Sequence, residues 1–394
     1  MSAPAVAADG VWAQVVGQPD AVAELRAAVA DPLAMTHAWL FTGPPGSGRS
    51  VAARAFAAAL QCPQGGDGTC HACRTVLAGT HADVHVVVPD GLSIGAKEAR
   101  ELVRVAGRAP SQGLWQVILV EDADRMTEQA ANAVLKMIEE PPARTVVMLC
   151  APSLHPDDVP VTVRSRCRVV GLRTPPVDAI ADVLVHRDGV DAALAAWAAG
   201  GAGGHIGRAR RLARDEDARM ARKAVLDIPL SLVSLAACLD AAADLLGAAQ
   251  EESDTATAAL DGPETEAVKA SLGYGARGPG ISASRGASGI LKDLERRQRS
   301  RATRLSRDSL DRALVDLAAF YRDAMVLDAM AGAEPPTLAH PDRRADATKL
   351  GALIGGDGAL RRIDAVLACR VALEQNVKPQ VALEALAVAL RLPG

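Results

Sequence analysis

Short apolar runs alternate with amphipathic segments along the first 174 residues of the chain. The runs have the length of buried strands, and apolar positions in the segments between them recur at helical spacing. Strands are predicted at residues 38–41, 84–88, 115–120, 145–150 and 167–171, and helices at 51–60, 96–108 and 128–140. Strands that alternate with helices predict an α/β fold, in which a parallel sheet is covered by helices on both faces.

The pattern changes after Pro175-Pro176, because a proline pair marks a boundary. Residues 175–225 are alanine-rich with helical spacing, interrupted by glycines at 200–204, and predict a small helical region. Residues 226–394 contain long alanine- and leucine-rich segments and predict an all-α region.

An irregular stretch is expected at residues 265–307. Its first part, 265–289, contains six glycines between Gly273 and Gly289 and predicts a flexible segment. The basic residues of 290–307 form either a solvated helix face or a contact with DNA phosphate.

Composition narrows the class of protein. Hydrophobic residues make up 49% of the 394 residues but aromatic residues only 2%, so the interior must consist mainly of Ala, Val and Leu. No run of eighteen uncharged apolar residues and no secretory signal pattern occurs, which predicts a cytoplasmic protein without membrane contact. The net charge of −4 excludes a global field that attracts DNA.

The segment FTGPPGSGRS at 41–50 fits the phosphate-loop pattern G-x-x-x-x-G-K-[ST] with one exception, since Arg49 stands where lysine belongs. A predicted strand precedes it and a predicted helix follows, so backbone N–H groups and the positive end of the helix would face phosphate. The candidate phosphate-binding residues are Gly43, Gly46, Gly48, Arg49 and Ser50. The alternative is a glycine-rich turn without a ligand.

Glu121 and Asp122 follow a predicted strand and form the second part of this candidate site. A working ATPase has aspartate first, near magnesium, and glutamate second, next to the attacking water. The reversed order moves the base back by roughly 1 Å, and a displacement on that scale can cost about a hundredfold in rate. The reversed acidic pair and Arg49 together predict weak or no ATP hydrolysis. ATP or ADP with Mg²⁺ remains a candidate cofactor. An ordinary solvated turn is the other interpretation.

Three of the seven cysteines crowd together, at Cys62, Cys70 and Cys73. This spacing suits three corners of a structural Zn²⁺ site. Asp67 is the preferred fourth ligand, because it lies three residues before Cys70, where another knuckle cysteine would fall. The other candidates for the fourth ligand are His71, His81 and His85. A loop of reduced thiols without metal, or a redox C-x-x-C, are the alternatives.

Taken in order, the motifs GPPGSGRS, CRTVLAGTHADV, VEDADRM, NAVLKMIEEPP and VTVRSRC resemble the delta-prime family of clamp-loader subunits of bacterial DNA polymerase III. The resemblance covers residues 10 to about 225 well and the remainder weakly. It implies an AAA+ module at 1–174, a helical lid at 175–225 and a helical collar at 226–394. It also implies a five-subunit ring with gamma/tau and delta subunits, which places a sliding clamp on primed DNA within a nucleotidyltransferase holoenzyme.

The resemblance implies roles for two further sites. Arg166, in VTVRSRC, matches an arginine that reaches ATP in the neighbouring subunit, although a lone loop arginine is also typical of a solvated charge. Residues 206–209 resemble the lid segment that senses nucleotide, and a helix–helix loop is the other interpretation. The family's zinc module has four cysteines, so Asp67 departs from it. A gamma/tau-like motor ATPase and a nucleotide-independent zinc-bearing scaffold are the alternative functions.

Overall fold

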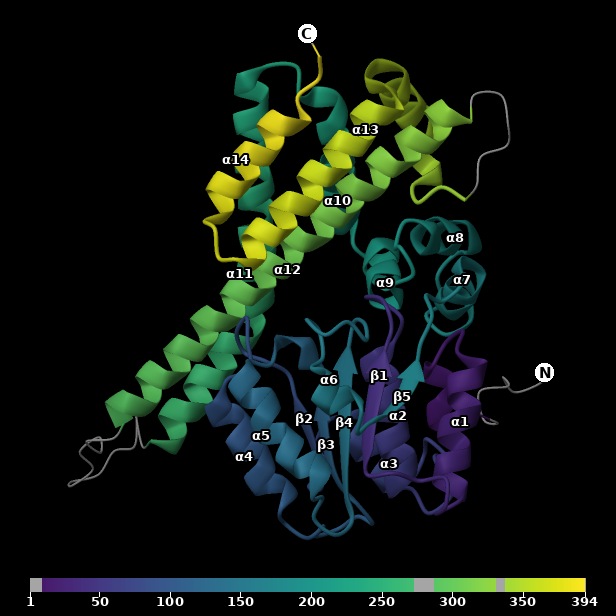
Figure 1. Cartoon of the computed structure of the whole chain (residues 1–394), viewed down its shortest axis with the longest axis vertical. Coiled ribbons are helices and arrows are strands. Elements are labelled where there is room, and N and C mark those ends of the chain that lie inside the picture. Colours follow the sequence, from purple (N-terminus) through teal and green to yellow (C-terminus); the bar gives the residue numbers. More distant parts are fainter. Residues whose placement is uncertain (1–8, 273–286, 331–336, 394) are drawn as a thin grey trace. The chain divides into compact units, whose positions relative to one another are not determined.

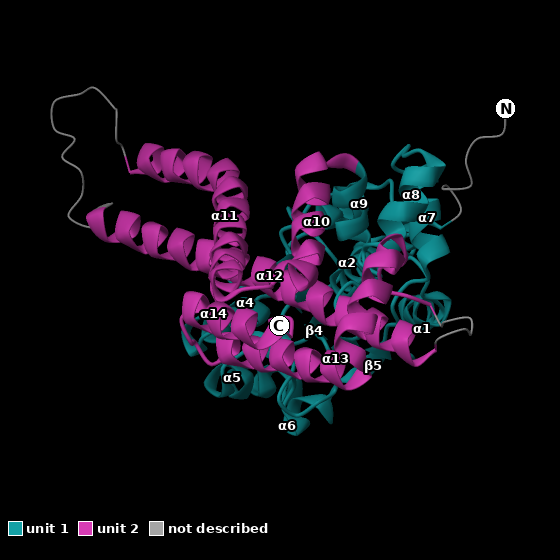
Figure 2. Ribbon diagram, turned by 90° about the horizontal axis from the view of Figure 1, so that it is seen from above, with its two compact units in different colours: residues 1–89, 93–213 teal, residues 90–92, 214–394 magenta. Residues whose placement is uncertain are grey.

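The computed structural model describes residues 9–272, 287–330 and 337–393. The chain divides into two compact units, which Figure 2 colours separately. Unit 1 comprises residues 1–89 and 93–213, and unit 2 comprises residues 90–92 and 214–394. No helix in the described ranges is long and apolar enough to cross a membrane.

A five-stranded parallel sheet forms the centre of unit 1, with the strand order β2-β3-β4-β1-β5 (Figure 1). Its strands are β1 (Ala38–Thr42), β2 (Val84–Val87), β3 (Gln116–Val120), β4 (Thr145–Ala151) and β5 (Arg168–Gly171). The predicted strands are therefore confirmed to within a residue or two at their ends. Every residue of β1, β3 and β4 is buried, as expected for a sheet covered on both faces.

Alternate residues of each central strand belong to two different cores. Trp39 and Phe41 pack on one face of the sheet with α1 (Pro19–Ala30) and α2 (Arg49–Gln61). Leu40 packs on the other face with α4 (Ala96–Ala106) and α5 (Glu128–Glu139). Because side chains of a strand alternate between faces, these mostly apolar strands supply both cores at once.

The remaining elements of unit 1 are short. They are η2 (Gly10–Gln14), α3 (His71–Leu77), η3 (Ala123–Arg125), α6 (Val161–Arg164), α7 (Val177–His186), α8 (Ala192–Gly200) and α9 (Ile206–Arg214). The predicted cap of α5 is confirmed, since the Thr127 hydroxyl accepts the Ala130 N–H at 3.2 Å.

Unit 2 is all-α, as predicted. It consists of α10 (Glu216–Ser231), α11 (Leu235–Ser271), α12 (Ala287–Ala329), η4 (Pro341–Arg343), α13 (Arg344–Glu374) and α14 (Pro379–Leu390). One core joins these helices, and Phe320 and Tyr321 are its largest fully buried side chains. The other core residues are mostly Leu, Ala and Val, in line with the low aromatic content of the chain.

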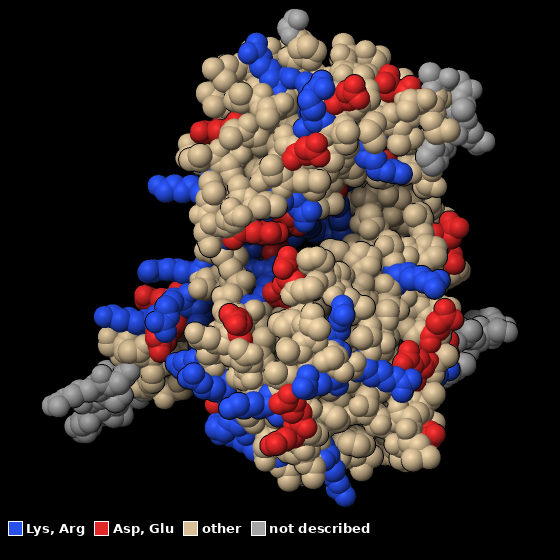
Figure 3. Space-filling model, in the orientation of Figure 1, with Lys and Arg blue, Asp and Glu red and all other residues tan. Residues whose placement is uncertain are grey.

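The prediction of an irregular stretch is wrong for residues 265–271 and 287–289, which are helical, whereas the interpretation of residues 290–307 as a helix face is confirmed. Residues 265–271 are the last turns of α11, and residues 287–307 belong to α12. The two helices run as a hairpin on which acidic α11 faces basic α12: Arg301 pairs with Asp261 at 2.9 Å and with Glu264 at 3.0 Å. Figure 3 shows charges of both signs on this hairpin, at lower left. Residues 273–286, which hold most of the glycines, lie outside the described residues.

The predicted domain boundaries differ from those of the two units. Residues 175–213 belong to unit 1 with the sheet, so the predicted lid is not a separate compact unit. Helix α10 runs through the predicted boundary at 225/226 and contains Pro229. Proline normally marks the first turn of a helix, whereas Pro229 lies inside this one.

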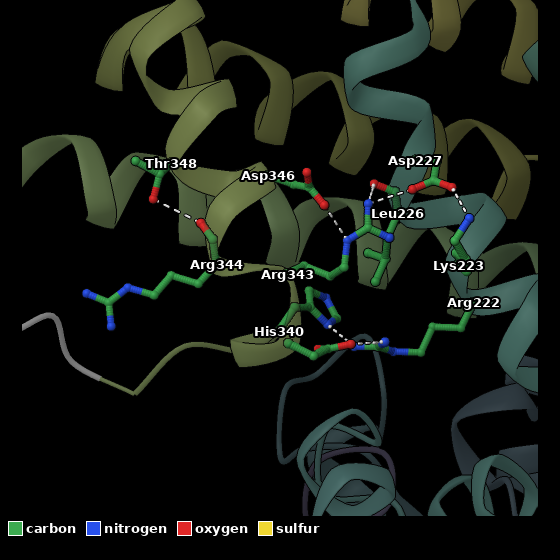
Figure 4. A network of polar contacts seen from close by, with 10 residues as sticks. Arg222, Lys223, Leu226, Asp227, His340, Arg343, Arg344, Asp346 and Thr348 are labelled. Atoms are coloured by element: carbon green, nitrogen blue, oxygen red, sulfur yellow. Dashed lines mark hydrogen bonds and ion pairs between the residues drawn. The ribbon is translucent and has the colours of Figure 1, made fainter.

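A buried polar network connects α10, α12 and η4 within unit 2 (Figure 4). Arg222 donates to both carboxylate oxygens of Asp342, at 2.7 and 2.9 Å. Its Nη2 lies 3.1 Å from Nδ1 of His340, whose Nε2 lies 3.2 Å from the Asp316 carbonyl. The His340 backbone N–H donates to Asp323 at 2.8 Å. Arginine can only donate and a carbonyl can only accept, so this geometry requires neutral His340 with its proton on Nε2.

Candidate nucleotide loop and metal site

The predicted phosphate loop connects β1 to α2, as the motif requires. Gly46 and Gly48 have φ values of 87° and 89°, in the left-handed region that favours glycine. A Cβ on Gly43 would lie 2.4 Å from the Leu172 carbonyl oxygen, so the loop packs closely on the segment after β5. Ser50 lies in the first turn of α2 and is half-buried. The sequence-predicted glycines are therefore needed for the backbone path of the loop.

Arg49 is turned back onto the loop from which it emerges. Its Nη1 donates to the Gly43 carbonyl oxygen at 2.6 Å. A lysine in this position would present a compact point charge with three rotatable donors, whereas the planar guanidinium is wider and already bonded to the loop backbone. A phosphate group in this loop would have to share Arg49 with the Gly43 carbonyl.

Gln18, a buried residue directly before α1, contacts the loop and was missed by the sequence reasoning. Its side-chain amide donates to the Ser47 carbonyl at 3.2 Å and to the Arg173 carbonyl at 2.5 Å, and its oxygen accepts the Arg173 N–H at 3.1 Å. Gln18 therefore ties the loop to the chain after β5. No sequence signal points to it, because its partner Arg173 lies 155 residues away.

The lid segment lies next to the same loop, within unit 1. A Cβ on Gly46 would come within 2.8 Å of the Cα and Cβ atoms of His205, directly before α9. Residues 206–209, which resemble a nucleotide-sensing segment, form the first turn of α9. The helix–helix interpretation of the glycine-rich residues 200–204 also holds, because they connect α8 and α9.

Glu121 and Asp122 lie at the carboxyl end of β3, as predicted, but both have arginine partners. Glu121 Oε1 accepts from Nε and Nη2 of Arg54, each at 2.7 Å. Asp122 Oδ2 lies 3.8 Å from Nε of Arg125. The sequence reasoning missed Arg54, although an arginine one turn after Ser50 in an alanine-rich helix is a usable signal.

The predicted zinc ligands come together. The ligand atoms of Cys62, Asp67, Cys70 and Cys73 all lie within 4.8 Å of one another. Cys62 Sγ is 3.7 Å from Cys70 Sγ and 3.5 Å from Asp67 Oδ1. A zinc tetrahedron with Zn–S of about 2.3 Å and Zn–O of about 2.1 Å has S–S edges of about 3.8 Å and S–O edges of about 3.6 Å. The four residues therefore fit a Cys₃Asp zinc site.

Hydrogen bonds orient the Asp67 carboxylate and favour the thiolate form of Cys62. Asp67 Oδ1 accepts the N–H groups of Cys70 and Thr69 at 3.1 Å each, and these bonds hold the pKa of Asp67 well below its usual range. Burial opposes the thiolate of Cys62, but backbone N–H groups of the loop outweigh it and lower the pKa of Cys62. Burial raises the pKa of Cys73 well above its usual range. The alternative ligands His71, His81 and His85 are not part of this cluster.

Arg166 follows α6 and is held by neighbours from its own unit. Its Nε lies 2.9 Å from Oε1 of Glu139, at the end of α5, and its Nη1 donates to the Thr162 carbonyl at 3.0 Å. The side chain is 42% exposed, so it is accessible despite the ion pair. Two neighbouring arginines also have partners in unit 1: Arg164 donates to the Leu154 carbonyl at 3.0 Å, and Arg168 lies 2.6 Å from Glu24.

Comparison with known proteins finds relatives of the region that contains most of these sites. Residues 17–176 match the protein family described as DNA polymerase III, delta subunit. The DNA polymerase III subunit delta' of Bacillus subtilis (strain 168) is 33% identical over 157 residues, which are 39% of this chain and 47% of that protein. Residues 17–176 are therefore similar to delta-prime subunits of DNA polymerase III. The fold of this region is α/β, with a parallel sheet covered by helices on both faces.

The same region also resembles gamma/tau subunits. The DNA polymerase III subunit gamma/tau of Mycobacterium tuberculosis (strain ATCC 25618 / H37Rv) is 36% identical over 160 residues, which are 39% of this chain and 27% of that protein. The chain thus spans less than half the length of both relatives. A gamma subunit-related protein of Thermotoga maritima aligns over 94% of this chain and 99% of its own, at 13% identity and a TM-score of 0.40, which carries no functional argument.

Proposed function

We propose that the chain is a delta-prime-type subunit of the DNA polymerase III clamp loader. It would help to load the sliding clamp onto primed DNA, supply Arg166 to a neighbouring ATP site, and have weak or no ATPase activity of its own. Two contacts at the phosphate loop carry this proposal. Arg49 bonds to the Gly43 carbonyl, and Arg54 bonds to Glu121. Both contacts disfavour the alternative, a gamma/tau-like motor.

The proposed role of Arg166 needs a side chain that can leave its own unit. Its ion pair with Glu139 joins two side chains that are 42% and 41% exposed, and such surface pairs contribute only about 0–1 kcal/mol. A guanidinium delivered to a partner's γ-phosphate is worth about 10³–10⁵ in rate in arginine-finger systems. Exchange of Glu139 for phosphate is therefore energetically accessible.

Zinc would be structural in this protein. Cys62, Asp67, Cys70 and Cys73 would hold it and close the loop between α2 and α3. Magnesium does not fit the residues at the end of β3 as they stand, because Arg54 occupies Glu121. ATP or ADP therefore remains a candidate ligand that binds to the loop but is not hydrolysed there.

Assembly with gamma/tau and delta subunits would use unit 2, in our proposal. One face of α14 is buried, and its outer face carries Val381 and Val388, which are 55% and 45% exposed. Gln380 and Glu384 also lie on this helix, so the exposed valines form an apolar patch with polar neighbours, as at protein–protein contacts. We assign another clamp-loader subunit as the partner that covers it, in a cytoplasmic complex that acts on clamp and primed DNA.

The decisive experiment compares Arg166→Ala with Arg164→Ala in a loader reconstituted with gamma/tau and delta subunits. Each variant removes one surface arginine, exposed Arg166 or half-buried Arg164, which should change stability by less than about 0.5 kcal/mol. Arg166→Ala is expected to lower the ATPase activity stimulated by clamp and primed DNA, partially, because other subunit boundaries keep their own arginines. Arg164→Ala should leave it unchanged. Wild-type clamp loading by a normally assembled Arg166→Ala complex would favour the scaffold alternative.

A further inference from the structure

The contact between Arg54 and Glu121 lies where a divalent metal would sit in a working phosphate loop. In such loops, the Ser or Thr after the lysine position places its hydroxyl on Mg²⁺, and a carboxylate from a neighbouring strand end completes the protein ligands. The corresponding residues here are Ser50 and Glu121. Arg54 is four residues after Ser50, so both side chains emerge from the same face of α2.

The contact occupies one oxygen of the Glu121 carboxylate. Two nitrogens of Arg54, Nε and Nη2, lie 2.7 Å from the same oxygen of Glu121. The carboxylate is 15% exposed and Arg54 is 33% exposed, so water screens the pair only in part. Magnesium requires oxygen ligands at about 2.0–2.1 Å in near-octahedral geometry, which excludes a guanidinium bonded to the same oxygen.

Displacing Arg54 would not solve the problem for a metal ion. A guanidinium remains protonated in proteins, so the displaced side chain would stay positively charged on the same helix face as Ser50. A dication at that place would meet like charge from Arg54 and from Arg49, which is bonded to the loop. Asp122 does not offer a second unoccupied carboxylate, because it has Arg125 at 3.8 Å.

Building on the proposed function, we infer that Arg54 is a specificity-determining residue that acts as an internal cation and excludes divalent metal from the phosphate loop. The replacement of lysine by Arg49 and the reversed acidic pair are then not the only causes of inactivity. Restoring lysine at position 49 leaves Arg54 on Glu121, so Arg49→Lys by itself does not create a magnesium site.

Metal binding to the isolated full chain tests this inference directly. Mn²⁺ is the probe, followed by electron paramagnetic resonance in the absence of nucleotide, with protein whose cysteine cluster has first been loaded with zinc. The wild-type chain and Arg49→Lys should bind no Mn²⁺ at the loop. Arg54→Gln should gain a site that binds about tenfold or more tightly than any wild-type site, and Glu121→Gln in the Arg54→Gln background should abolish the gain.

Arg26→Gln is the matched control, because Arg26 is also an ion-paired arginine of unit 1, bonded to Asp9 at 2.7 Å. It should gain no Mn²⁺ site. Circular dichroism of each variant checks that the fold is kept; if Arg54→Gln unfolds, Arg54→Met provides the same test. Mn²⁺ binding by the wild-type chain that is lost in Glu121→Gln would overturn the inference, and so would folded Arg54 variants that gain no site. Neither result depends on the Arg166 experiment, so the proposed function can fail or stand separately.

Discussion

Single side chains decide what the phosphate loop of unit 1 can do. Arg49 fits the position of a catalytic lysine in sequence, yet its guanidinium is bonded to the carbonyl of the first loop glycine. Arg54 bonds directly to the neighbouring carboxylate of Glu121, and we infer that this bond keeps the carboxylate from binding metal. The loop thus keeps the backbone shape of a phosphate site, while its charged side chains are bonded to each other and to the loop.

The isolated chain should therefore hydrolyse ATP far more slowly than about 1 s⁻¹, a rate that ordinary enzymes exceed. The physical reason is that Arg54 is bonded to Glu121 and Arg49 is bonded to the loop backbone. Phosphate release from purified protein, with Mg²⁺ and excess ATP, measures the rate. Turnover at about 1 s⁻¹ or faster would show that the loop is a working ATPase and favour the motor alternative.

One zinc ion per chain is expected at the cysteine cluster, with Asp67 as the fourth ligand. Asp67→Ala should weaken zinc binding by about tenfold or more and lower the thermal stability of the zinc-loaded chain, because binding energy adds to folding energy. Competition with a chromogenic chelator measures the affinity. His71→Ala is the control, since His71 is exposed, adjacent and outside the cluster.

Two results would contradict this prediction in different ways. Native protein that contains no zinc by metal analysis would reject the site as a whole. Unchanged zinc affinity in Asp67→Ala would reject only the fourth ligand, and leave the three thiolates in place.

At the scale of elements, the sequence predicted best what depends on local pattern. The all-apolar strands, the Thr127 cap and the loop glycines each follow from a few neighbouring residues. The α11–α12 hairpin was missed because its basic helix is neutralised by acidic residues about forty positions earlier, such as Asp261 beside Arg301. Arg54 and Glu121 are 67 residues apart, and no period or spacing connects them.

The buried polar network that connects α10, α12 and η4 predicts how the stability of unit 2 depends on pH. Burial lowers the pKa of His340, and Arg222 lowers it further, although Asp316 and Asp323 oppose this. An unfolded histidine titrates near 6.5, so the unfolded chain binds the proton first. The stability that neutral His340 contributes is therefore present above about pH 6.5 and is lost as the pH falls from there toward the folded pKa.

His340→Gln should reduce this pH dependence, because glutamine can also donate and accept but does not titrate. The variant is expected to cost about 1–3 kcal/mol at neutral pH and to lose less stability than wild type between pH 7.5 and 5.5. All four tryptophans lie in unit 1, so far-UV circular dichroism follows both units while tryptophan fluorescence follows only unit 1. Equal slopes with pH for both proteins would contradict the prediction.

The whole molecule, as proposed, is one subunit of a larger assembly. Val381→Asp and Val388→Asp place a charge on the outer face of α14 and should weaken binding to the other loader subunits by about tenfold or more, because a carboxylate would be buried without a partner. Folding of the isolated chain should be unaffected, since both positions are about half exposed. Size-exclusion chromatography with the partner subunits measures assembly.

Leu33→Asp is the matched control for the α14 variants. Leu33 is 95% exposed and belongs to unit 1. The substitution therefore removes an exposed apolar side chain of similar size and leaves α14 unchanged. If the α14 variants assemble as well as Leu33→Asp does, the outer face of α14 is not the contact with the other subunits.

The ion pair between Arg166 and Glu139 has a consequence for the entropy of assembly. A free arginine side chain samples many rotamers, a freedom worth about 2 kcal/mol, and a phosphate contact would remove most of it. Arg166 is already restricted by Glu139 and by its bond to the Thr162 carbonyl, so part of that freedom is lost before any partner arrives. A weak contact that contributes almost nothing to folding can in this way make a later contact with another subunit's nucleotide more favourable.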